Sequence, residues 1–152
     1  MLKDWHSLDE ELIPFVLKMD CTDFEKFINT LNCMEKNNDT LNKVENFSTF
    51  WLMNSRNEII GVANIRHKLN GKLFNQIGHI AYGIRPSMRN RGYATALLEM
   101  AIKEGRNMGI EQIRITCSSN NIGSERVILK NGGVFDIEIE VEGVLTKFFW
   151  VK

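Results

Sequence analysis

The sequence of 152 residues predicts a mixed α/β fold, and three observations carry that prediction. Apolar residues recur at helical spacing before residue 32 and again between residues 93 and 108. They alternate with polar residues between residues 48 and 84 and near the C-terminal end, as in strands with one buried face. A helix that joins two neighbouring strands of one sheet connects them in parallel, so at least one strand pair is expected to be parallel.

Two helices are expected at the N-terminal end. The first starts at Asp9 and is broken by Pro14. The second follows the MDCTD segment and spans residues 24–31, with Thr22 or Asp23 as its N-cap. The Asn-rich residues 35–46 predict a loop. We therefore expect the first strand to follow this loop.

The middle of the chain predicts three antiparallel strands. Residues 48–53, 58–68 and 76–84 each alternate with a period of two. Turn residues at 54–57 and 70–72 separate them. Short turns of this kind connect antiparallel neighbours.

The C-terminal half predicts two helices and three further strands. A helix over residues 93–108 precedes a strand over residues 112–117. A short helix then opens at Asn121, and a hairpin that turns at Glu142 and Gly143 closes the chain. The parallel strand pair is expected on either side of the 93–108 helix.

Composition excludes several classes of partner. Nineteen basic and nineteen acidic side chains cancel, so the chain has no global field that would attract nucleic acid or an anionic membrane. Three widely spaced cysteines fit a reducing compartment, and the scattered histidines show no zinc spacing. No apolar run reaches the ~18 residues of a membrane span, and the N-terminus lacks the pattern of a signal peptide. These features predict a single cytoplasmic domain over residues 1–152, without a metal, a nucleic-acid partner or a membrane partner.

A local anion site is predicted where the 93–108 helix begins. Arg89 and Arg91 supply cationic donors, Gly92 lets a ligand approach the backbone closely, and Ala94 keeps the first turn unobstructed. The free N–H groups and the dipole of a helix start favour phosphate. The segment therefore predicts a site for a diphosphate.

The same residues resemble the acyl-CoA signature of the GNAT superfamily of N-acetyltransferases. That signature is Arg/Gln-x-x-Gly-x-Gly/Ala after a strand ending in Val/Ile-x-Pro, and Arg89–Ala94 after Ile84–Pro86 matches it. A second signature, Asn-x-x-Ser at the start of the next helix, is matched by Asn121–Ser124. The resemblance runs from about Ser48 to the C-terminus, and more narrowly the chain is similar to a bacterial subgroup of predicted acetyltransferases.

The resemblance implies a binding site for acetyl-CoA between two strands that splay apart. The backbone from Arg89 to Thr95 would hold the pyrophosphate, and the backbone of Ile84 would pair with the pantetheine arm. Asn121 would lie near the thioester, with Ser124 beside it. The implied cofactor-binding residues are Ile84, Arg89, Asn90, Arg91, Gly92, Tyr93, Ala94, Thr95, Asn121 and Ser124.

The resemblance also implies direct transfer of the acetyl group to a primary amine of a small molecule or peptide. A lysine-like amine has a pKa of ~10.4 and must lose a proton before it attacks. We predict His79 as that base, and a histidine that is hydrogen-bonded within the sheet is an equal alternative; His67 is a weaker candidate. The family often carries a Tyr that protonates the departing thiolate four residues after the helix-opening Ser, but this chain has Ile128 there.

Further alternatives concern Cys117 and the function as a whole. Cys117 could be a nucleophile, although a small buried core residue is the commoner role. Ile128 and the absence of the strand that usually opens the family's fold favour a rival function, a non-catalytic acyl-CoA-binding or regulatory module. The missing strand would leave the edge of residues 48–53 free, which favours a homodimer.

Overall fold

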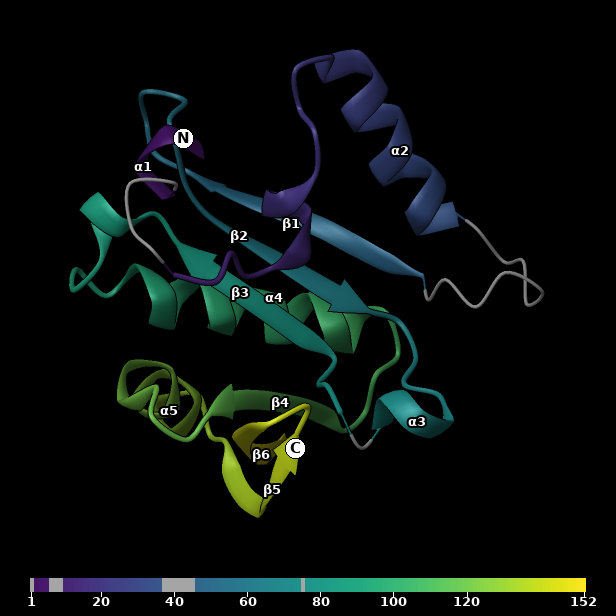
Figure 1. Ribbon diagram of the computed structural model, residues 1–152, viewed down its shortest axis with the longest axis vertical. Coiled ribbons are helices and arrows are strands. Elements are labelled where there is room, and N and C mark those ends of the chain that lie inside the picture. The colour runs from purple at the N-terminus through teal and green to yellow at the C-terminus, as the bar shows by residue number, and fades with distance from the viewer. Residues whose placement is uncertain (1, 6–9, 37–45, 75) are drawn as a thin grey trace.

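The computed structural model describes residues 2–5, 10–36, 46–74 and 76–152, and shows one sheet with helices on both of its faces (Figure 1). The strands are β1 (Phe47–Met53), β2 (Ile59–Arg66), β3 (Ile80–Ile84), β4 (Ile113–Ser118), β5 (Val134–Val141) and β6 (Val144–Val151). The α-helices are α1 (Leu2–Trp5), α2 (Phe24–Lys36), α3 (Gly71–Phe74), α4 (Tyr93–Asn107) and α5 (Ile122–Lys130), and the 3-10 turns are η1 (Phe15–Lys18) and η2 (Pro86–Met88). The predicted mixed α/β fold is confirmed.

The strands follow the order β1-β2-β3-β4-β6-β5 across the sheet. Strands β1, β2 and β3 are antiparallel neighbours, as are β4, β6 and β5, whereas β3 and β4 are parallel. Helix α4 connects β3 to β4, so the parallel pair lies where the sequence predicts it. Within the described chain β1 forms one edge of the sheet.

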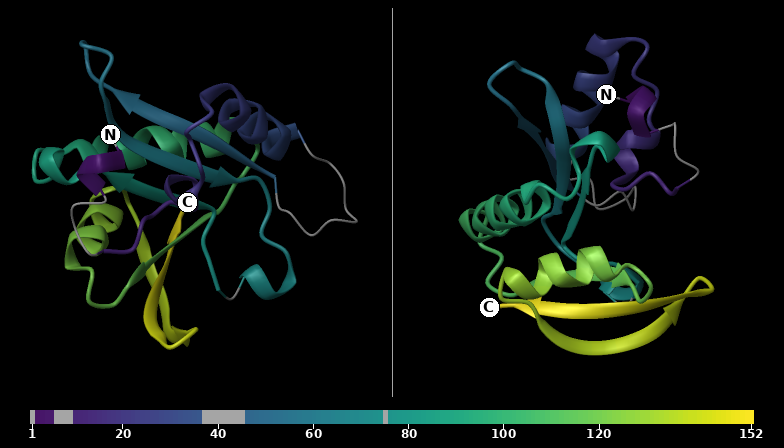
Figure 2. Two further views of the ribbon diagram at one scale, coloured as in Figure 1. Left: turned by 45° about the horizontal axis from the view of Figure 1, so that its top comes forward. Right: turned by 90° about the vertical axis from the view of Figure 1, so that its left-hand side faces the viewer.

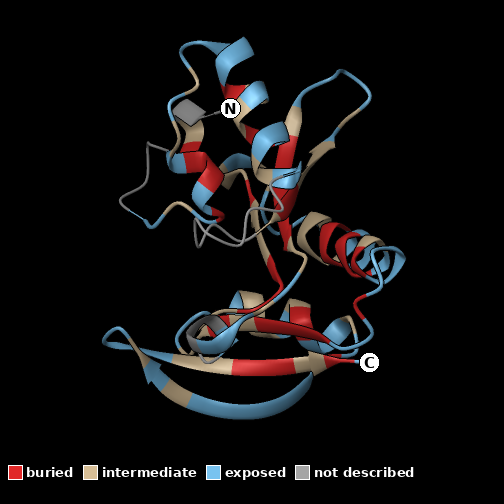
Figure 3. Ribbon diagram, turned by 90° about the vertical axis from the view of Figure 1, so that its right-hand side faces the viewer, coloured by how far each residue is buried: buried red, intermediate tan, exposed pale blue. Residues whose placement is uncertain are grey.

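Two hydrophobic cores lie on opposite faces of the sheet. Val62 and Ala63 of β2 belong to different cores because successive side chains of a strand point to opposite faces. Helix α4 covers one face and α2 the other (Figure 2). Helix α4 contributes the predicted apolar stripe, in which the buried residues are Leu97, Leu98, Ala101 and Ile102. Burial of each large apolar side chain contributes about 1.5–3 kcal/mol, so the buried sides of α4 and α2 hold these helices on the sheet. Figure 3 shows the buried residues in red.

Two local predictions from side-chain and turn chemistry are confirmed. The Asp23 carboxylate accepts a hydrogen bond of 3.0 Å from the backbone N–H of Lys26, as an N-cap of α2 should. Glu142 and Gly143 both have positive φ, at 51° and 82°, between β5 and β6. Positive φ at both central residues is the hairpin turn whose twist matches the strands.

Two expected boundaries are wrong. The helix expected around Pro14 is the short 3-10 turn η1, in which Leu17 N–H donates to Pro14 O over 3.0 Å before the chain becomes extended at Met19. Strand β3 begins at Ile80 instead of residue 76, and its register with β2 starts at the pair Ile80 with Ile65. The predicted loop over residues 35–46 is largely outside the described residues, and α2 extends into its first two positions.

Helix α3 is not expected from the sequence and depends on an aromatic cluster around Arg114. The guanidinium carbon of this buried arginine lies 4.4 Å from the ring centroid of Phe74 on α3, 4.5 Å from that of Phe148 and 5.0 Å from that of Trp150. Arg114 also pairs with Asp136 at 3.3 Å. Cation–π contacts and this ion pair stabilise a charge that burial alone would disfavour.

Candidate functional site

Strands β3 and β4 meet at one end and separate at the other. Their register is the single pair Ile80 with Ile115, and Figure 1 shows them drawing apart toward their carboxyl ends. Backbone groups of successive residues point to alternate edges of a strand. Because Arg85 N–H donates to Ile60 O of β2, the backbone groups of Tyr82 and Ile84 point to the β4 side. Strand β3 therefore presents polar backbone to the region where the sheet has opened.

The turn before α4 contains two residues in the left-handed region. Asn90 has φ of 60° and Gly92 has φ of 82°. A Cβ on Gly92 would meet nothing within 4 Å, so there is room for a larger side chain. The positive φ is what favours glycine at this position. No side chain caps the N-terminus of α4. The first N–H groups of this helix are thus available to an anion at an exposed turn.

The guanidinium of Arg89 is engaged with the N-terminal segment. Its Nε donates to Ile84 O over 3.0 Å and its Nη1 donates to Glu10 Oε2 over 3.0 Å, while Nη2 donates to the other oxygen of Glu10. These hydrogen bonds lower the pKa of Glu10 below its ordinary value. Of the two predicted arginines, Arg89 is therefore held by a carboxylate and Arg91 lies exposed beside Gly92.

The N-terminal segment also contacts β3 directly. A Cβ on Gly83 would lie 2.2 Å from the carbonyl oxygen of Ile13, so the close approach of these two backbones requires glycine. Arg85 Nε lies 2.8 Å from Asp4 Oδ2. No sequence pattern indicates these contacts, because their partners are about 70–80 positions apart, and the sequence analysis missed Asp4, Glu10 and Gly83.

His79 joins β3 to β4 immediately before the strands separate. The His79 ring nitrogen Nδ1 accepts a hydrogen bond of 2.9 Å from the backbone N–H of Arg114, and the backbone N–H of His79 donates to the backbone oxygen of Arg114. The residue is 8% exposed. Burial, with the positive charges of Arg114 and Arg66, lowers the pKa of His79 below its ordinary value. The neutral ring therefore carries its proton on Nε2, which is the hydrogen-bonded geometry of the structural alternative.

Tyr82 links β3 to the start of α5. Its hydroxyl oxygen lies 2.9 Å from Ser124 Oγ, and the Ser124 N–H donates to Asn121 Oδ1 over 3.0 Å. Asn121 is thus the N-cap of α5, as the sequence predicts. Burial raises the pKa of Tyr82 to about 12, so its phenol is protonated at neutral pH. The structure brings Ser124 to Tyr82, a residue that the sequence analysis did not assign to the site.

Cys117 and Ile128 are core residues. Burial, and then the charge of Glu125, raise the pKa of Cys117 to about 11, which keeps it a thiol at neutral pH. The thiolate is the nucleophilic form, so this environment favours the interpretation of Cys117 as a core residue. Ile128 is fully buried on α5 and has no proton to donate.

The chain matches a known protein family over most of its length. The model of the acetyltransferase (GNAT) domain matches residues 2–134, which is most of the chain. The chain belongs to the GNAT acetyltransferase family. The resemblance carried by Arg89–Ala94 and Asn121–Ser124 is therefore confirmed at the level of the family, and this GNAT chain is an acyltransferase enzyme.

Solved structures share the GNAT fold at low sequence identity. A chimera of the spermidine N-acetyltransferase SpeG from Vibrio cholerae and hSSAT has a TM-score of 0.65 and 13% identity, over 99% of this chain and 87% of the other. The aminoglycoside acetyltransferase AAC(6')-Ib in complex with coenzyme A has a TM-score of 0.61 and 17% identity, over 71% of this chain and 67% of the other. None of the curated proteins matches the sequence.

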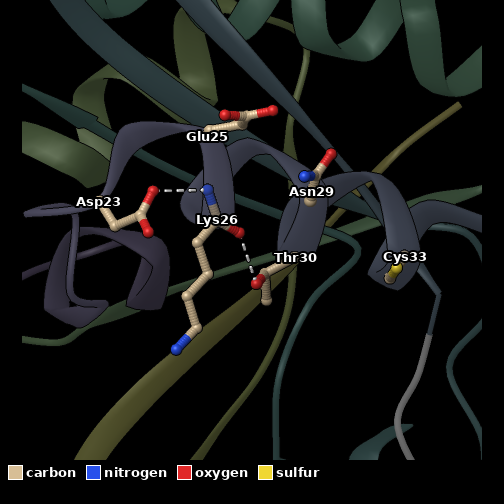
Figure 4. Close-up of a pocket in the computed structure, with 6 residues that line it drawn as sticks. All are labelled: Asp23, Glu25, Lys26, Asn29, Thr30 and Cys33. Carbon is tan, nitrogen blue, oxygen red and sulfur yellow. Dashed lines mark hydrogen bonds between the residues drawn. The ribbon is translucent and has the colours of Figure 1, made fainter.

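A surface hollow of the GNAT chain lies away from the separating strands, on α2 (Figure 4). It follows the exposed side of this helix and is lined by Asp23, Glu25, Lys26, Asn29, Thr30 and Cys33. Two of these polar groups are already used within the helix, since Asp23 caps Lys26 and the Thr30 hydroxyl donates to Lys26 O. We interpret this hollow as a solvated helix face.

The described residues were searched for metal-binding groups and for membrane-spanning helices. They contain no group of three or more His, Cys, Asp or Glu side chains arranged to hold a metal ion. Among the same residues, no helix has the length and apolarity needed to cross a bilayer.

Proposed function

We propose that this protein is an acetyl-CoA-dependent N-acetyltransferase that transfers the acetyl group directly to a primary amine. One observation carries the proposal: β3 and β4 pair at Ile80 and Ile115 and then separate beside the uncapped turn of α4. An extended pantetheine arm can pair with the free backbone edge of β3, while a diphosphate binds the N–H groups of the turn. The likeness to a structure that holds coenzyme A supports the same cofactor.

The proposed cofactor site uses backbone groups more than side chains. Ile84 would pair with the pantetheine arm, and the segment Arg89–Thr95 would bind the pyrophosphate. Arg91 is exposed beside Gly92 and would supply a positive charge at the turn. Asn121 and Ser124, at the start of α5, would lie near the thioester. Acetyl-CoA supplies the activated acyl group when it is bound, and the chain orients it.

The acceptor in this proposal is a small-molecule or peptide amine. Similar structures are named as a spermidine N-acetyltransferase and an aminoglycoside acetyltransferase, and the amines in both names are cations at neutral pH. Four exposed carboxylates on the hairpin of β5 and β6 would attract such cations over a distance of about a Debye length. They belong to Asp136, Glu138, Glu140 and Glu142.

The identity of the base is a separate part of the proposal. His79 stays a prediction for this role. A base needs a free lone pair, and His79 offers one only after the bond from Arg114 N–H breaks. The alternative is that the amine loses its proton to solvent water, and substitution of His79 distinguishes the two.

We further propose a single cytoplasmic domain of bacterial type that forms a homodimer. The balanced charge and the cysteine content support this location. The β1 edge, which pairs on one side with β2 in the described chain, supports a second protomer as its cover.

A direct assay tests the function. The purified protein is mixed with acetyl-CoA and a panel of primary amines that includes spermidine, an aminoglycoside and lysine peptides, and free thiol is measured over time. We expect thiol release that depends on one class of amine. Tight binding of CoA in calorimetry without turnover on any amine would instead support the rival function, a non-catalytic acyl-CoA-binding or regulatory module.

Glu10 is expected to compete with the diphosphate for Arg89. Glu10→Gln removes the charge that holds this guanidinium, so CoA affinity should rise by up to about fivefold, because an exposed ion pair contributes about 0–1 kcal/mol. Calorimetric titration with CoA measures the change. The matched control is Glu11→Gln, which breaks the neighbouring pair with Lys18 (2.9 Å) and should leave the affinity unchanged. Equal affinities in all three proteins would contradict a role for Arg89 in binding CoA.

A further inference from the structure

Residues 10–13 cross β3 near its carboxyl end. The carbonyl oxygen of Ile13 lies so close to Gly83 that a side chain does not fit between the two backbones. Trp5 and Val16, which flank the crossing in the chain, are each 2% exposed and belong to the core that α2 covers. The N-terminal segment is therefore anchored on both sides of the crossing, beside the region where β3 and β4 separate (Figure 1).

Glu10, at the start of the crossing, holds a carboxylate beside the edge of β3. Arg89 Nη1 donates to Glu10 Oε2 over 3.0 Å, and Nε of the same guanidinium donates to the carbonyl oxygen of Ile84 over 3.0 Å. A single guanidinium therefore separates the Glu10 carboxylate from the backbone of β3. The side chains of Glu10 and Arg89 are 35% and 38% exposed, so a ligand can reach both from solvent.

The proposed diphosphate offers Arg89 a second anionic partner. Arginine binds phosphate oxygens with the same paired hydrogen bonds that it makes to a carboxylate. The diphosphate has the uncapped N–H groups of the α4 turn as further partners, whereas the exposed pair of Arg89 with Glu10 is weak. The guanidinium is therefore expected to turn from Glu10 to the bound diphosphate, which releases the carboxylate.

A released Glu10 favours a cation. Its ordinary pKa of about 4.3 keeps it ionised at neutral pH, close to the negative charge that the cofactor has brought. Primary amines with a pKa of ~10.4 arrive as ammonium ions and are attracted to such a carboxylate. The nitrogen that attacks the thioester must be neutral, so the ammonium that pairs with Glu10 is a different amino group of the same acceptor.

We propose that Glu10 is a specificity-determining residue that exchanges partners, from Arg89 in the free enzyme to an ammonium group of a diamine or polyamine acceptor once acetyl-CoA is bound. The inference rests on the proposed function and narrows its acceptor to molecules with at least two amino groups. It also predicts positive coupling between the two substrates, because binding of the cofactor releases the carboxylate that the amine uses.

Linkage between the two ligands tests the exchange without turnover. Calorimetry measures the affinity of the wild-type protein for α,ω-diamines of three to six carbons, with and without saturating free CoA. We expect CoA to raise the affinity for the best diamine by about fivefold, and that diamine to raise the affinity for CoA by the same factor, because coupling is reciprocal. The diol of the same length carries no charge and should show no coupling.

Glu10→Gln should move the two affinities in opposite directions. CoA should bind up to about fivefold more tightly because Arg89 is released, while the diamine should lose its coupling and its KM in turnover should rise by about fivefold. The KM for a monoamine of the same length should stay unchanged, because its one nitrogen must attack. Glu10→Asp keeps the charge and should recover part of the coupling.

Glu11→Gln is the matched control. It removes the neighbouring carboxylate, which pairs with Lys18 at 2.9 Å, and should leave the coupling and both KM values unchanged. Glu10 and Glu11 are both exposed residues, so neither substitution is expected to unfold the protein.

The outcomes distinguish failure of this inference from failure of the proposed function. If CoA binds but the diamine binds equally well with and without it, or if Glu10→Gln keeps the coupling, Glu10 does not hold the acceptor and the proposed function stands. If CoA does not bind the wild-type protein, the proposed function fails and this inference fails with it.

Discussion

Affinity for CoA is expected to fall by at least about 100-fold in the double variant Arg91→Glu, Gly92→Val. The glutamate replaces a cation that would contact the diphosphate with an anion, and a charge-assisted hydrogen bond contributes about 1.5–3 kcal/mol. Valine at a φ of 82° costs roughly a further 1–2 kcal/mol and closes the approach to the backbone. Since 1.4 kcal/mol is a tenfold change, the two effects together correspond to roughly two to three and a half orders of magnitude. Calorimetric titration with CoA measures the loss.

The other end of α4 offers a matched control. Gly109 has φ of 86°, and a Cβ there would also meet nothing within 4 Å. The double variant Lys103→Glu, Gly109→Val therefore makes the same charge reversal and the same backbone change on the same helix. We expect it to lose similar stability while CoA affinity stays within about twofold of wild type, because the interaction with the helix dipole falls off within a turn. A folded Arg91→Glu, Gly92→Val protein with wild-type affinity would refute the diphosphate site.

Replacement of His79 by Leu is expected to destabilise the fold by about 1–3 kcal/mol. It leaves the N–H of the buried Arg114 without an acceptor, and an unsatisfied buried donor has a cost of this size. His79→Asn offers a carbonyl oxygen close to the position of Nδ1 and should recover part of the loss. Thermal unfolding measures both variants, and we expect Tm to fall by roughly 3–10 °C for Leu and less for Asn.

The same two variants test the predicted base. If His79 is structural, turnover in His79→Asn should stay within about tenfold of wild type. A loss of about 10²-fold or more at unchanged Tm would instead establish His79 as the base. Identical Tm values for the wild type and His79→Leu would contradict the structural contact.

The stability of the fold should also depend on pH through His79. Its pKa is lowered in the folded protein, so the unfolded chain binds the proton more tightly. The stabilisation from the neutral ring is therefore complete above the unfolded pKa of ~6.5 and is lost as the pH falls through the lower folded pKa. Urea unfolding between pH 5 and 8 should show a slope in wild type that is smaller in His79→Asn.

Local sequence patterns predicted the elements that depend on residues close together in the chain. The apolar stripe of α4, the N-cap at Asp23 and the turn at Glu142 and Gly143 depend on residues within a few positions of one another. Prediction failed where a distant partner decided the conformation. His79, which precedes β3, bonds to Arg66 of β2 and to Arg114 of β4. Helix α3 packs Phe74 against Arg114, forty residues along the chain.

The sequence by itself determined the family, the parallel pairing of the two strands that α4 connects, and the glycine turn before α4, because each follows from a local pattern of residue type and spacing. The tertiary structure alone decided that Glu10 holds Arg89, that His79 bonds to Arg114, and that Tyr82 meets Ser124. These contacts join segments 35 to 79 positions apart. Hydrogen bonds of this kind depend on how the strands and helices pack, and no local preference of the chain specifies them.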